Sequence, residues 1–401
     1  MDFEDSTDEA AYRRDVQAWL AENVPAHHAE THVDGLAAAK AWQARKARGG
    51  YAQITWPREW GGGGGTAIQS VIFGQEEAKH DVDSRPFAIG LGMCVPTVMK
   101  FGDDAARGRF VGPAVRGEEI WSQLFSEPAG GSDVAAIRTR AVRDGDDWVV
   151  NGQKVWTSGA HYSDFGILLV RTNSDVPKHK GLTMFWLDLK SPGVEIRPIH
   201  QMSGGSNFNE VYFTDVRIPD SQRLGAVDDG WNVGLFTLMN ERLAIGGGSG
   251  VGPAELLELA RALPAAEGTL LGDAAFRQRY ADWYVAAQGL KNTRMRTMTA
   301  LSKGQTPGPE SAIGKIVAAN QMQELGNAAI EAEDQFGIID DPALAPMRAA
   351  FQSLVMSAPG YRIAGGTDEI LKNIIAERVL GLPGEVRTDK DKAFRDLAVG
   401  R

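Results

Sequence analysis

The sequence predicts a mainly α-helical protein with a central antiparallel β domain. Three observations support this fold class: helical periodicity dominates residues 1–118, short β-rich segments fill 119–229, and long helical segments occupy 230–384. Because the strands do not alternate with helices along the chain, a doubly wound parallel sheet is not expected. We therefore predict three domains with these boundaries, followed by a C-terminal tail at 385–401.

The N-terminal domain begins with a clear helix signal. Ser6 and Glu9 form a capping-box pattern, in which each side chain bonds the backbone N–H of the other residue. Tyr12, Val16 and Leu20 follow at helical spacing, which predicts a helix with one apolar face. Two further segments of this domain have the same periodicity, 35–48 and 66–80.

The central region changes to the period of strands. Segments rich in β-branched and aromatic residues, separated by turn residues, are typical of strands. Asn151 and Gly152 lie between two further β-rich runs and predict the turn of a β-hairpin, because this dipeptide favours the type I′ turn. The other expected strands are 165–170, 182–189, 194–199 and 209–218.

Helical periodicity returns in the C-terminal region and predicts a helical bundle. The expected helical segments are 231–262, 274–303, 309–334, 344–357 and 367–380.

Composition narrows the class of protein. The 401 residues are 43% hydrophobic, enough for a large core. The net charge of −10, without a basic stripe, argues against a nucleic-acid partner. The single cysteine, Cys94, is expected in the core and fits a reducing compartment. The N-terminus is acidic, and no apolar run approaches the roughly 20 residues that span a bilayer. We therefore expect a cytoplasmic protein without a membrane span.

Two segments could be taken for ligand sites, but an ordinary connection between helices explains each of them more simply. The five glycines at 61–65 could cradle a phosphate, but no Gly-Lys-Ser/Thr follows them, so a flexible connection between helices is expected. The cluster HHAETH, with His27, His28, Glu30 and His32, could hold a metal, but it lacks His-Glu-x-x-His spacing and follows Pro25 in a polar stretch. We therefore expect a solvated loop there and no metal.

Two loops of the central domain carry groups that suit a planar, phosphate-bearing ligand. Residues 125–133 (FSEPAGGSD) place small and hydroxyl residues, with their backbone N–H groups, directly after an expected strand. In 154–159 (KVWTSG), Trp156 could pack on a planar cofactor while Thr157 or Ser158 hydrogen-bonds its edge. Either loop alone could be an ordinary turn. Together, in one β domain flanked by helices, they indicate a cofactor site.

A helix expected over 237–248 carries two charged residues on surfaces that otherwise look buried. Glu241 lies on a strip of apolar and small residues, and Arg242 lies on a strip with Leu235 and Met239. Adjacent residues on a helix point about 100° apart, so the two charges do not face each other. A carboxylate among apolar neighbours suits a general base.

These motifs resemble the acyl-CoA dehydrogenase family over residues 10–384. The resemblance rests on five segments in the family's order: FSEPAGGSD, NGQKVWTSG, NEVYFTDVRIP, GWNVGLFTLMNERLAI and AGGTDEILKNIIAERVLGLP. It implies the acyl-CoA dehydrogenase-like three-domain architecture, with a C-terminal four-helix bundle and FAD between the β domain and the bundle, at a subunit interface. It also implies α,β-dehydrogenation of an acyl-CoA thioester to the trans-2-enoyl-CoA, in fatty acid or steroid side-chain metabolism. Electrons would pass to an electron-transfer flavoprotein.

The resemblance also assigns roles to single residues. Ser126 would meet the pyrimidine oxygens of the flavin, Trp156 would pack on its ring, and Thr157 and Ser158 would lie beside its N5 edge. The backbone N–H of Gly365 would stabilise the thioester oxygen. The cofactor-binding residues implied are Gln123, Phe125, Ser126, Gly131, Ser132, Trp156, Thr157, Ser158, Thr367 and Glu369, and the substrate-binding residues are Ser132, Arg242 and Gly365.

Two departures from the commonest family pattern bear on catalysis and assembly. The position that often carries the catalytic glutamate is Gly365 in this sequence. In a subset of the family the base comes instead from the helix that holds NERLAI. The resemblance therefore implies that Glu241 is the catalytic base. The family's Arg-x-x-Phe-Gly segment has no counterpart near 263–275, and Gly337 lies in atypical surroundings. We expect a homodimer, a homotetramer or a heteromer with a related subunit.

Two other functions stay open. An acyl-CoA oxidase or a monooxygenase on the same fold would use oxygen, and a peroxide assay would distinguish it. A non-catalytic scaffold subunit of a heteromeric dehydrogenase is favoured by the missing arginine segment and opposed by Glu241 and the complete flavin loops. The acyl group is not readable, although the glycines of 246–252 would leave room for a wide one.

Overall fold

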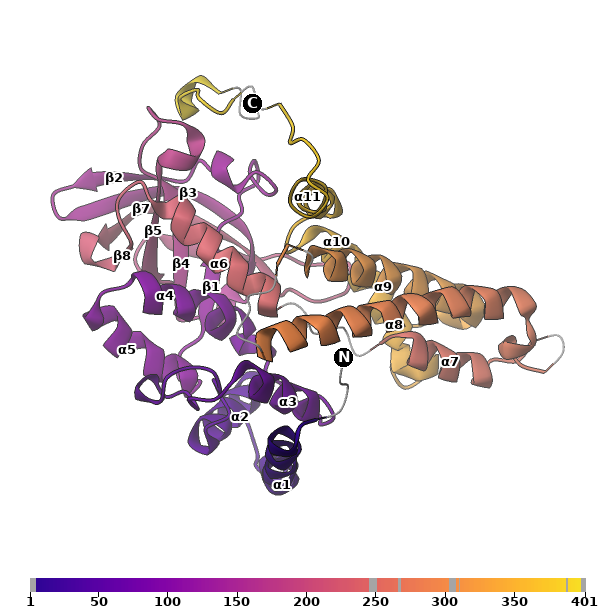
Figure 1. Ribbon diagram of the computed structural model, residues 1–401. Helices are drawn as coiled ribbons and strands as arrows, with labels where there is room; N and C mark the ends of the chain where they lie inside the picture. Colours follow the sequence, from indigo (N-terminus) through magenta and orange to yellow (C-terminus); the bar gives the residue numbers. More distant parts are fainter. Residues whose placement is uncertain are drawn as a thin grey trace. The chain divides into compact units, whose positions relative to one another are not determined.

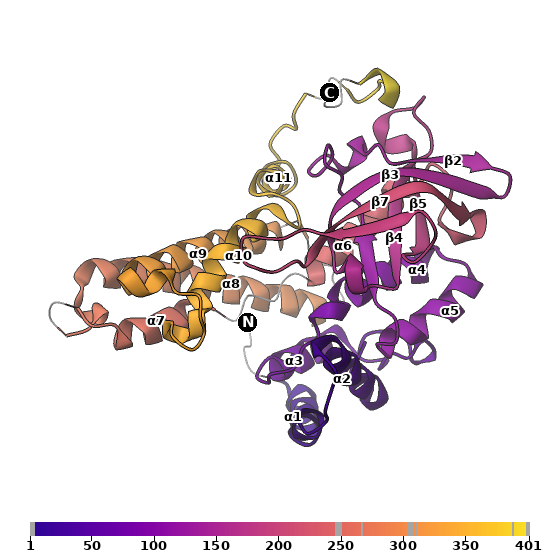
Figure 2. The same cartoon turned by 180° about the vertical axis from the view of Figure 1, so that it is seen from behind.

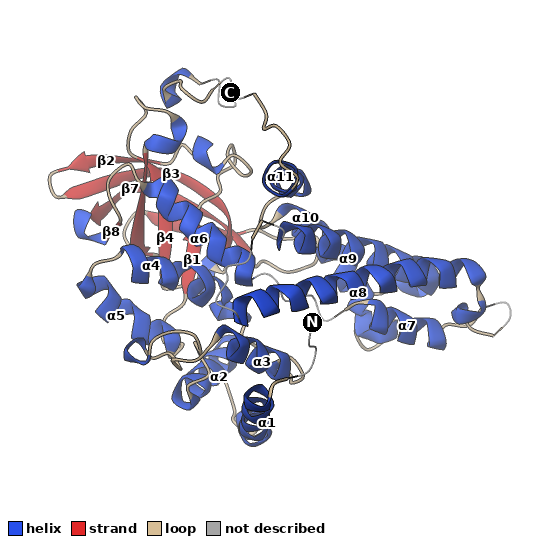
Figure 3. Cartoon of the chain, viewed as in Figure 1, coloured by secondary structure: helices blue, strands red, loops and turns tan. Residues whose placement is uncertain are grey.

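The computed structural model describes residues 5–244, 251–265, 268–302, 308–309, 311–386 and 389–397 (Figure 1). The chain forms two compact units. The sheet unit contains the N-terminal helices, the strands, helix α6 and the C-terminal residues from 386 onward, and the bundle unit contains Gln201–Gly205 and the helices between residues 245 and 385. Helices predominate and the strands gather in one sheet (Figure 3), which confirms the predicted fold class.

The helices that precede the sheet confirm the predicted helical start of the chain. The capping box forms as expected: the Glu9 N–H donates to Ser6 Oγ at 3.3 Å, and the Ser6 N–H donates to the Glu9 carboxylate at 2.7 Å. Val16, Leu20 and Trp42 are buried in one apolar cluster of this region. The helices are α1 (Thr7–His28), α2 (Gly35–Gly49), α3 (Ala67–Glu77), α4 (Val95–Phe101) and α5 (Asp104–Val115). Cys94 is buried in the core, as predicted.

The five glycines at 61–65 connect two helical segments, as predicted, and they do so through a hydrogen-bonded turn. All five N–H groups donate to backbone carbonyls of residues 53–58, at 2.7–3.1 Å. Because these N–H groups are paired, the turn presents no amide cradle to a phosphate. A Cβ on Gly62 would lie 2.2 Å from the Trp56 carbonyl oxygen, and Gly61 and Gly64 have φ angles of +82° and +65°. Close packing and left-handed backbone both require glycine here.

Replacing Gly62 with alanine is expected to lower the free energy of unfolding by about 1–3 kcal/mol, because the new methyl group overlaps a backbone carbonyl. Gly74→Ala is the matched control. Gly74 is exposed on α3, and a Cβ there meets nothing within 4 Å, so this change should raise stability by about 0.5–1 kcal/mol. Denaturant unfolding of both variants measures the difference. Equal stabilities would show that the glycine turn yields to the extra methyl group.

The β-rich region forms an eight-stranded sheet in the order β6-β7-β3-β2-β4-β5-β8, with β1 paired to β4. Most neighbours are antiparallel, as predicted, but β4 pairs in parallel with β1 and, at one position, with β2. The four strands predicted between residues 165 and 218 occur with ends within one residue of those expected. The strands are β1 (Trp121–Leu124), β2 (Arg140–Asp144), β3 (Asp147–Ser158), β4 (Phe165–Arg171), β5 (Leu182–Asp188), β6 (Val194–Pro198), β7 (Phe208–Pro219) and β8 (Arg223–Leu224).

The predicted hairpin turn at Asn151-Gly152 is wrong. Strand β3 continues through these residues, and the turn between β2 and β3 lies at residues 145–146. Gly145 supplies the left-handed backbone of that turn, with φ of +63°. At Gly152 the register of β3 against β7 shifts, and a Cβ would lie 2.5 Å from Thr139 Oγ1. The Asn-Gly pair therefore marks an irregularity and a close contact within the sheet, not a chain reversal.

The bundle unit consists of helices packed around an apolar core that includes Leu256, Trp283 and Phe351. Helix α9 packs against both α8 and α10 (Figure 2). The predicted segment 231–262 contains two helices, α6 of the sheet unit and α7 of the bundle unit, and residues 245–250 lie outside the described residues. The helices are α7 (Pro253–Ala262), α8 (Ala274–Ser302), α9 (Ser311–Glu333), α10 (Ala350–Ile363) and α11 (Asp368–Ile374). Among all the described helices, none is long and apolar enough to span a membrane.

The C-terminal residues contact the strands of the sheet unit. Ala393 forms a β-bridge with Pro177, and the Phe394 N–H donates to the Val176 carbonyl at 2.9 Å. The Phe394 ring lies 3.7 Å from the guanidinium of Arg171. Residues 393–394 are thus held on the segment between β4 and β5.

Candidate functional site

The predicted residues of 154–159 lie at a distorted end of strand β3. The register against β7 shifts between Lys154 and Thr157, and Trp156 has a φ angle of +59°. Left-handed backbone at such a bulky residue costs on the order of 1–3 kcal/mol, so the surroundings must maintain it. The distortion leaves the Trp156 side chain exposed, at 58% of its full surface, with its ring edge-on to Phe208.

The hydroxyl of Thr157 is buried and unpaired. The residue is 1% exposed, and within the described part of the chain its Oγ1 has no hydrogen-bond partner. Its carbonyl accepts from Asn209 Nδ2 at 2.9 Å, and the Ser158 carbonyl accepts from Ser122 Oγ at 2.9 Å. The backbone on both sides of the hydroxyl is therefore fixed. Since buried hydroxyls usually have a partner, Thr157 marks a position where a ligand can complete the bonding.

A buried ion pair lies next to this distortion. Lys154 Nζ lies 2.7 Å from Glu127 Oε1 and donates to the Phe125 carbonyl at 2.9 Å. Glu127 also accepts from the backbone N–H groups of Arg138 and Thr139, at 2.6 and 2.9 Å. The pair therefore ties strand β3 to the 125–133 loop.

Both members of this pair are charged at neutral pH. Burial outweighs the attraction of Glu127 and lowers the pKa of Lys154 to about 8. Burial alone would raise the pKa of Glu127, but the charge of Lys154 and the hydrogen bonds to the carboxylate outweigh it and lower that pKa. Two charges with complementary hydrogen bonds thus form the support of the loop.

The 125–133 loop contacts strand β3 through its backbone. The Val155 N–H donates to the Ser126 carbonyl at 2.9 Å. Phe125 is buried and Ser126 is half-buried, whereas Gly131 and Ser132 are exposed. The structure therefore brings the beginning of this loop next to the Trp156 distortion and leaves its second half open to solvent.

Two further contacts fix the ends of this region. Gln123 is half-buried on β1, in register with Ile167 of β4. Lys178 Nζ lies 2.6 Å from both Asp133, at the end of the loop, and Asp389, in the C-terminal segment. The C-terminal segment thus shares a cation with the loop.

Helix α6 (Gly230–Ala244) packs directly on this part of the sheet unit. A Cβ on Gly234 would lie 3.8 Å from the ring of Phe125, so the helix approaches a predicted flavin-binding residue closely. Thr237 Oγ1 lies 2.8 Å from Thr97 Oγ1, and both side chains are fully buried. These contacts fix the helix before it reaches the predicted catalytic residue.

Residue 241 lies one turn after Thr237 on the same face of helix α6. Along the helix axis it is about 10 Å from Gly234. The side chains of Glu241 and Arg242 lie outside the described residues, so their roles stay predictions. The expectation that the Arg242 strip is buried is wrong where it can be tested, because Leu235 and Met239 are 42% and 57% exposed. The buried face of α6 is instead the face that carries Thr237.

The predicted residues near 365–369 belong to the bundle unit. Gly365 has a φ angle of +65°, and Thr367 caps helix α11 by accepting an N–H of its first turn at 3.3 Å. Glu369 is exposed on that turn. Asp368, between them, is buried and accepts from Arg362 Nε at 2.8 Å. The segment is thus a rigid turn with a glycine in left-handed conformation.

Sequence reasoning missed Glu127, Lys154 and Asn209, which hold the predicted ligand groups in place. All three lie within segments already quoted for other residues. One signal was available: Lys154 has the same strand parity as Trp148 and Val150, which predicts an inward side chain. A lysine on an inner face needs an anionic partner, and Glu127 lies in the neighbouring motif.

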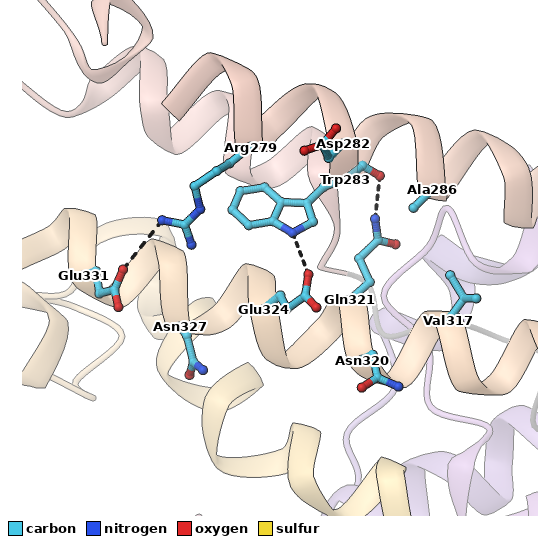
Figure 4. A pocket seen from close by; sticks show the side chains of 10 residues that line it. All are labelled: Arg279, Asp282, Trp283, Ala286, Val317, Asn320, Gln321, Glu324, Asn327 and Glu331. Atoms are coloured by element: carbon cyan, nitrogen blue, oxygen red, sulfur yellow. Dashed lines mark hydrogen bonds and ion pairs between the residues drawn. The ribbon is translucent and has the colours of Figure 1, made fainter. Parts of the chain in front are cut away.

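A hollow of about 540 Å³ lies between helices α8 and α9 (Figure 4). Trp283 donates to Glu324 at 3.0 Å, Gln321 Nε2 donates to the Trp283 carbonyl at 2.5 Å, and Arg279 lies 3.8 Å from Glu331. Most of the polar groups that line the hollow are therefore paired with one another. None of the predicted flavin or substrate residues whose side chains the structure describes lines it, so we do not assign the chemistry to it.

Three sequence models of one family match the chain in order. They are the N-terminal, middle and C-terminal domains of acyl-CoA dehydrogenases, over residues 6–118, 122–216 and 228–380. The acyl-CoA dehydrogenase IpdE1 of Mycobacterium tuberculosis is 35% identical, covering 94% of this chain and 98% of its own length. The acyl-CoA dehydrogenase FadE34 of the same organism is 40% identical over 82% of this chain, which spans 44% of that relative's length.

Solved structures agree with the sequence matches. The crystal structure of the ChsE4-ChsE5 complex from Mycobacterium tuberculosis contains a chain that is 28% identical, with a TM-score of 0.78, covering 96% of this chain and 100% of that one. Butyryl-CoA dehydrogenase from Megasphaera elsdenii, at 19% identity and a TM-score of 0.76, shares the fold. The chain therefore belongs to the acyl-CoA dehydrogenase family, whose members are flavoprotein oxidoreductases with FAD as cofactor.

Proposed function

We propose that this chain is an FAD-dependent acyl-CoA dehydrogenase in which Glu241 is the general base. Its substrate is an acyl-CoA thioester and its product the trans-2-enoyl-CoA. The observation that carries the proposal is the juxtaposition, on one β-bulge, of an exposed and strained Trp156 with the buried, unpaired hydroxyl of Thr157. Backbone strain at such a position supports a functional role.

These two residues fit the two kinds of surface that a flavin presents. The exposed indole of Trp156 suits the face of a planar ring, and the Thr157 hydroxyl suits a nitrogen at its edge. Ser126 and Ser158 add hydroxyls to the same region, and the exposed Gly131 and Ser132 leave space for a pyrophosphate. Gln123, Phe125, Thr367 and Glu369 complete the proposed cofactor contacts. When bound, FAD supplies the acceptor for a hydride.

The protein's own part in the reaction is to take a proton and to stabilise charge. The carboxylate of Glu241 would accept the α-proton of the thioester, while the β-carbon loses a hydride and the Cα–Cβ double bond forms. The N–H of Gly365 would donate to the thioester oxygen as negative charge develops there, with Ser132 and Arg242 binding the substrate. The packing of α6 on Phe125 and Thr97 supports this role, because a general base must be held in place.

The proposal extends to partners. Electrons would pass to an electron-transfer flavoprotein, and the chain would work in the cytoplasm as a homodimer, a homotetramer or a heteromer. The solved ChsE4-ChsE5 complex and the lack of an Arg-x-x-Phe-Gly segment near 263–275 support a heteromer with a related subunit. In that case one chain would not supply every contact to each FAD.

The test is an anaerobic titration of the FAD-reconstituted protein, alone and with a related subunit, with straight-chain, branched and steroid side-chain acyl-CoAs. We expect non-covalent FAD, loss of the visible absorbance of oxidised flavin with the preferred acyl-CoA, and turnover with an electron-transfer flavoprotein. Native mass and flavin content measured together give the assembly. Rapid peroxide formation in air would instead identify an oxidase or a monooxygenase. FAD binding without bleaching by any acyl-CoA would support a scaffold subunit and overturn the proposal.

A further inference from the structure

The end of helix α1 brings together three side chains that can ligate a metal. His27 lies in the last turn of α1, and Glu30 and His32 follow in the connection to α2. One ligand atom of each lies within 4.8 Å of the others, and the rings of His27 and His32 have centroids 5.2 Å apart. The predicted solvated loop is therefore wrong for His27, which is helical and 6% exposed.

The two imidazoles have unsatisfied nitrogens. His27 Nδ1 and His32 Nε2 are buried, and neither has a hydrogen-bond partner among the residues that the structure describes. Buried polar atoms normally have a partner, so two such nitrogens in one cluster point to a missing ligand. His28, in the same turn of the helix, differs because its Nε2 is paired with the Asp81 carbonyl at 2.8 Å.

The charges around the cluster suit a cation. Burial and the neighbouring His32 lower the pKa of His27, so these surroundings disfavour a second positive charge on this side chain. One oxygen of Glu30 is bonded to Arg45 of α2, and the other lies 3.6 Å from His32 Nε2. Arg45 thus orients the carboxylate and leaves its second oxygen facing the imidazoles.

We propose that His27, Glu30 and His32 bind a divalent transition-metal ion of the zinc type, with a fourth position for water. Two imidazoles and a carboxylate form a ligand set that zinc accepts, with bonds of about 2.0–2.2 Å. The spacing does not require a continuous helix, because the chain turns after α1: the Glu30 N–H donates to the His27 carbonyl at 3.2 Å. The metal would fasten the end of α1 to the connection that precedes α2.

The site is independent of the proposed flavin site. Its residues come from α1 and the α1–α2 connection. The proposed flavin residues of the sheet unit lie on β1 and β3 and in the 125–133 loop. The test therefore reads metal binding directly and does not depend on dehydrogenase activity. A negative result for metal binding would not contradict the proposed dehydrogenase function. A negative result for dehydrogenase activity would not contradict the metal site.

The experiment uses full-length, tag-free protein reconstituted with FAD and stripped with a chelator. Isothermal titration with Zn²⁺ should give one site per chain, and His32→Gln should weaken it by at least about tenfold. His28→Gln is the matched control, in the same turn but outside the cluster, and should bind as the wild type does. Elemental analysis after dialysis gives the stoichiometry independently.

A second variant and a second readout guard against unfolding. His27→Gln, at a buried position, should lose the same site, and Zn²⁺ should raise the thermal midpoint of wild type and His28→Gln only. Metal-free circular dichroism checks that all variants are folded. Absence of a stoichiometric site in wild type, or equal affinity in wild type and His32→Gln, would overturn the proposal.

Discussion

Replacing Glu241 with glutamine is expected to reduce acyl-CoA dehydrogenation by about 10²–10⁴-fold, the range typical of a lost general base. Glutamine keeps the volume and the helix propensity of glutamate but cannot accept the α-proton. Because α6 is anchored by Gly234 and Thr237, upstream of residue 241, the fold and the FAD content should not change. Stopped-flow measurement of flavin bleaching by the preferred acyl-CoA gives the rate, and equilibrium titration should show that acyl-CoA still binds.

The matched control for this variant is Glu22→Gln, an exposed glutamate on α1, which should leave the rate unchanged. Among the acidic residues of the 364–369 segment, Asp368 is the buried rival for the role of base. Its carboxylate is already paired with the guanidinium of Arg362, at 2.8 Å. Near-normal bleaching by Glu241→Gln would move the base elsewhere and disprove our interpretation of α6.

Replacing Lys154 with methionine is expected to lower the free energy of unfolding by about 3–5 kcal/mol, because it leaves the Glu127 carboxylate buried without its counter-ion. The Phe125 carbonyl loses its donor at the same time. These contacts tie β3 to the 125–133 loop, so FAD retention should fall as well. Denaturant unfolding measures the first effect, and flavin content after gel filtration measures the second.

Two comparisons separate this pair from a general effect of losing a lysine. Lys190→Met removes an exposed lysine paired with Asp164 and should change stability by less than about 1 kcal/mol. The double variant Lys154→Met with Glu127→Gln removes both charges and should be more stable than Lys154→Met alone, because no unpaired charge stays buried. If Lys154→Met were as stable as Lys190→Met, the buried pair would not hold the loop.

Sequence patterns predicted a helix or strand correctly where the interactions that form it lie within one segment of the chain. The capping box at Ser6 and Glu9 formed, and the four strands predicted between residues 165 and 218 fell within one residue of expectation, because these signals depend on hydrogen bonds and burial along one segment. The Asn151-Gly152 turn failed for a long-range reason. Strand β3 is paired along its length with β7, more than fifty residues away, and that pairing overrides the local turn preference.

The candidate flavin site divides in the same way. The sequence selected Trp156, Thr157 and Ser158 by residue type, but not the strained backbone that exposes Trp156 or the burial that leaves the Thr157 hydroxyl unpaired. Both residues lie where the register of β3 against β7 shifts, next to the buried Lys154–Glu127 pair. Neither can be derived from the order of residues in one segment, because each depends on which strands become neighbours.

By itself, the sequence determined the order of helices, strands and helices, the family, and the position of Glu241 on a helix that follows the β domain. Each of these follows from periodicity or from motifs that are contiguous in the chain. Only the tertiary structure decided that the glycines at 61–65 form a hydrogen-bonded turn, that Lys154 and Glu127 pair in the core, and that His27 and His32 share one cluster with Glu30. The physical reason is that burial and pairing depend on groups far apart in sequence, which folding alone brings together.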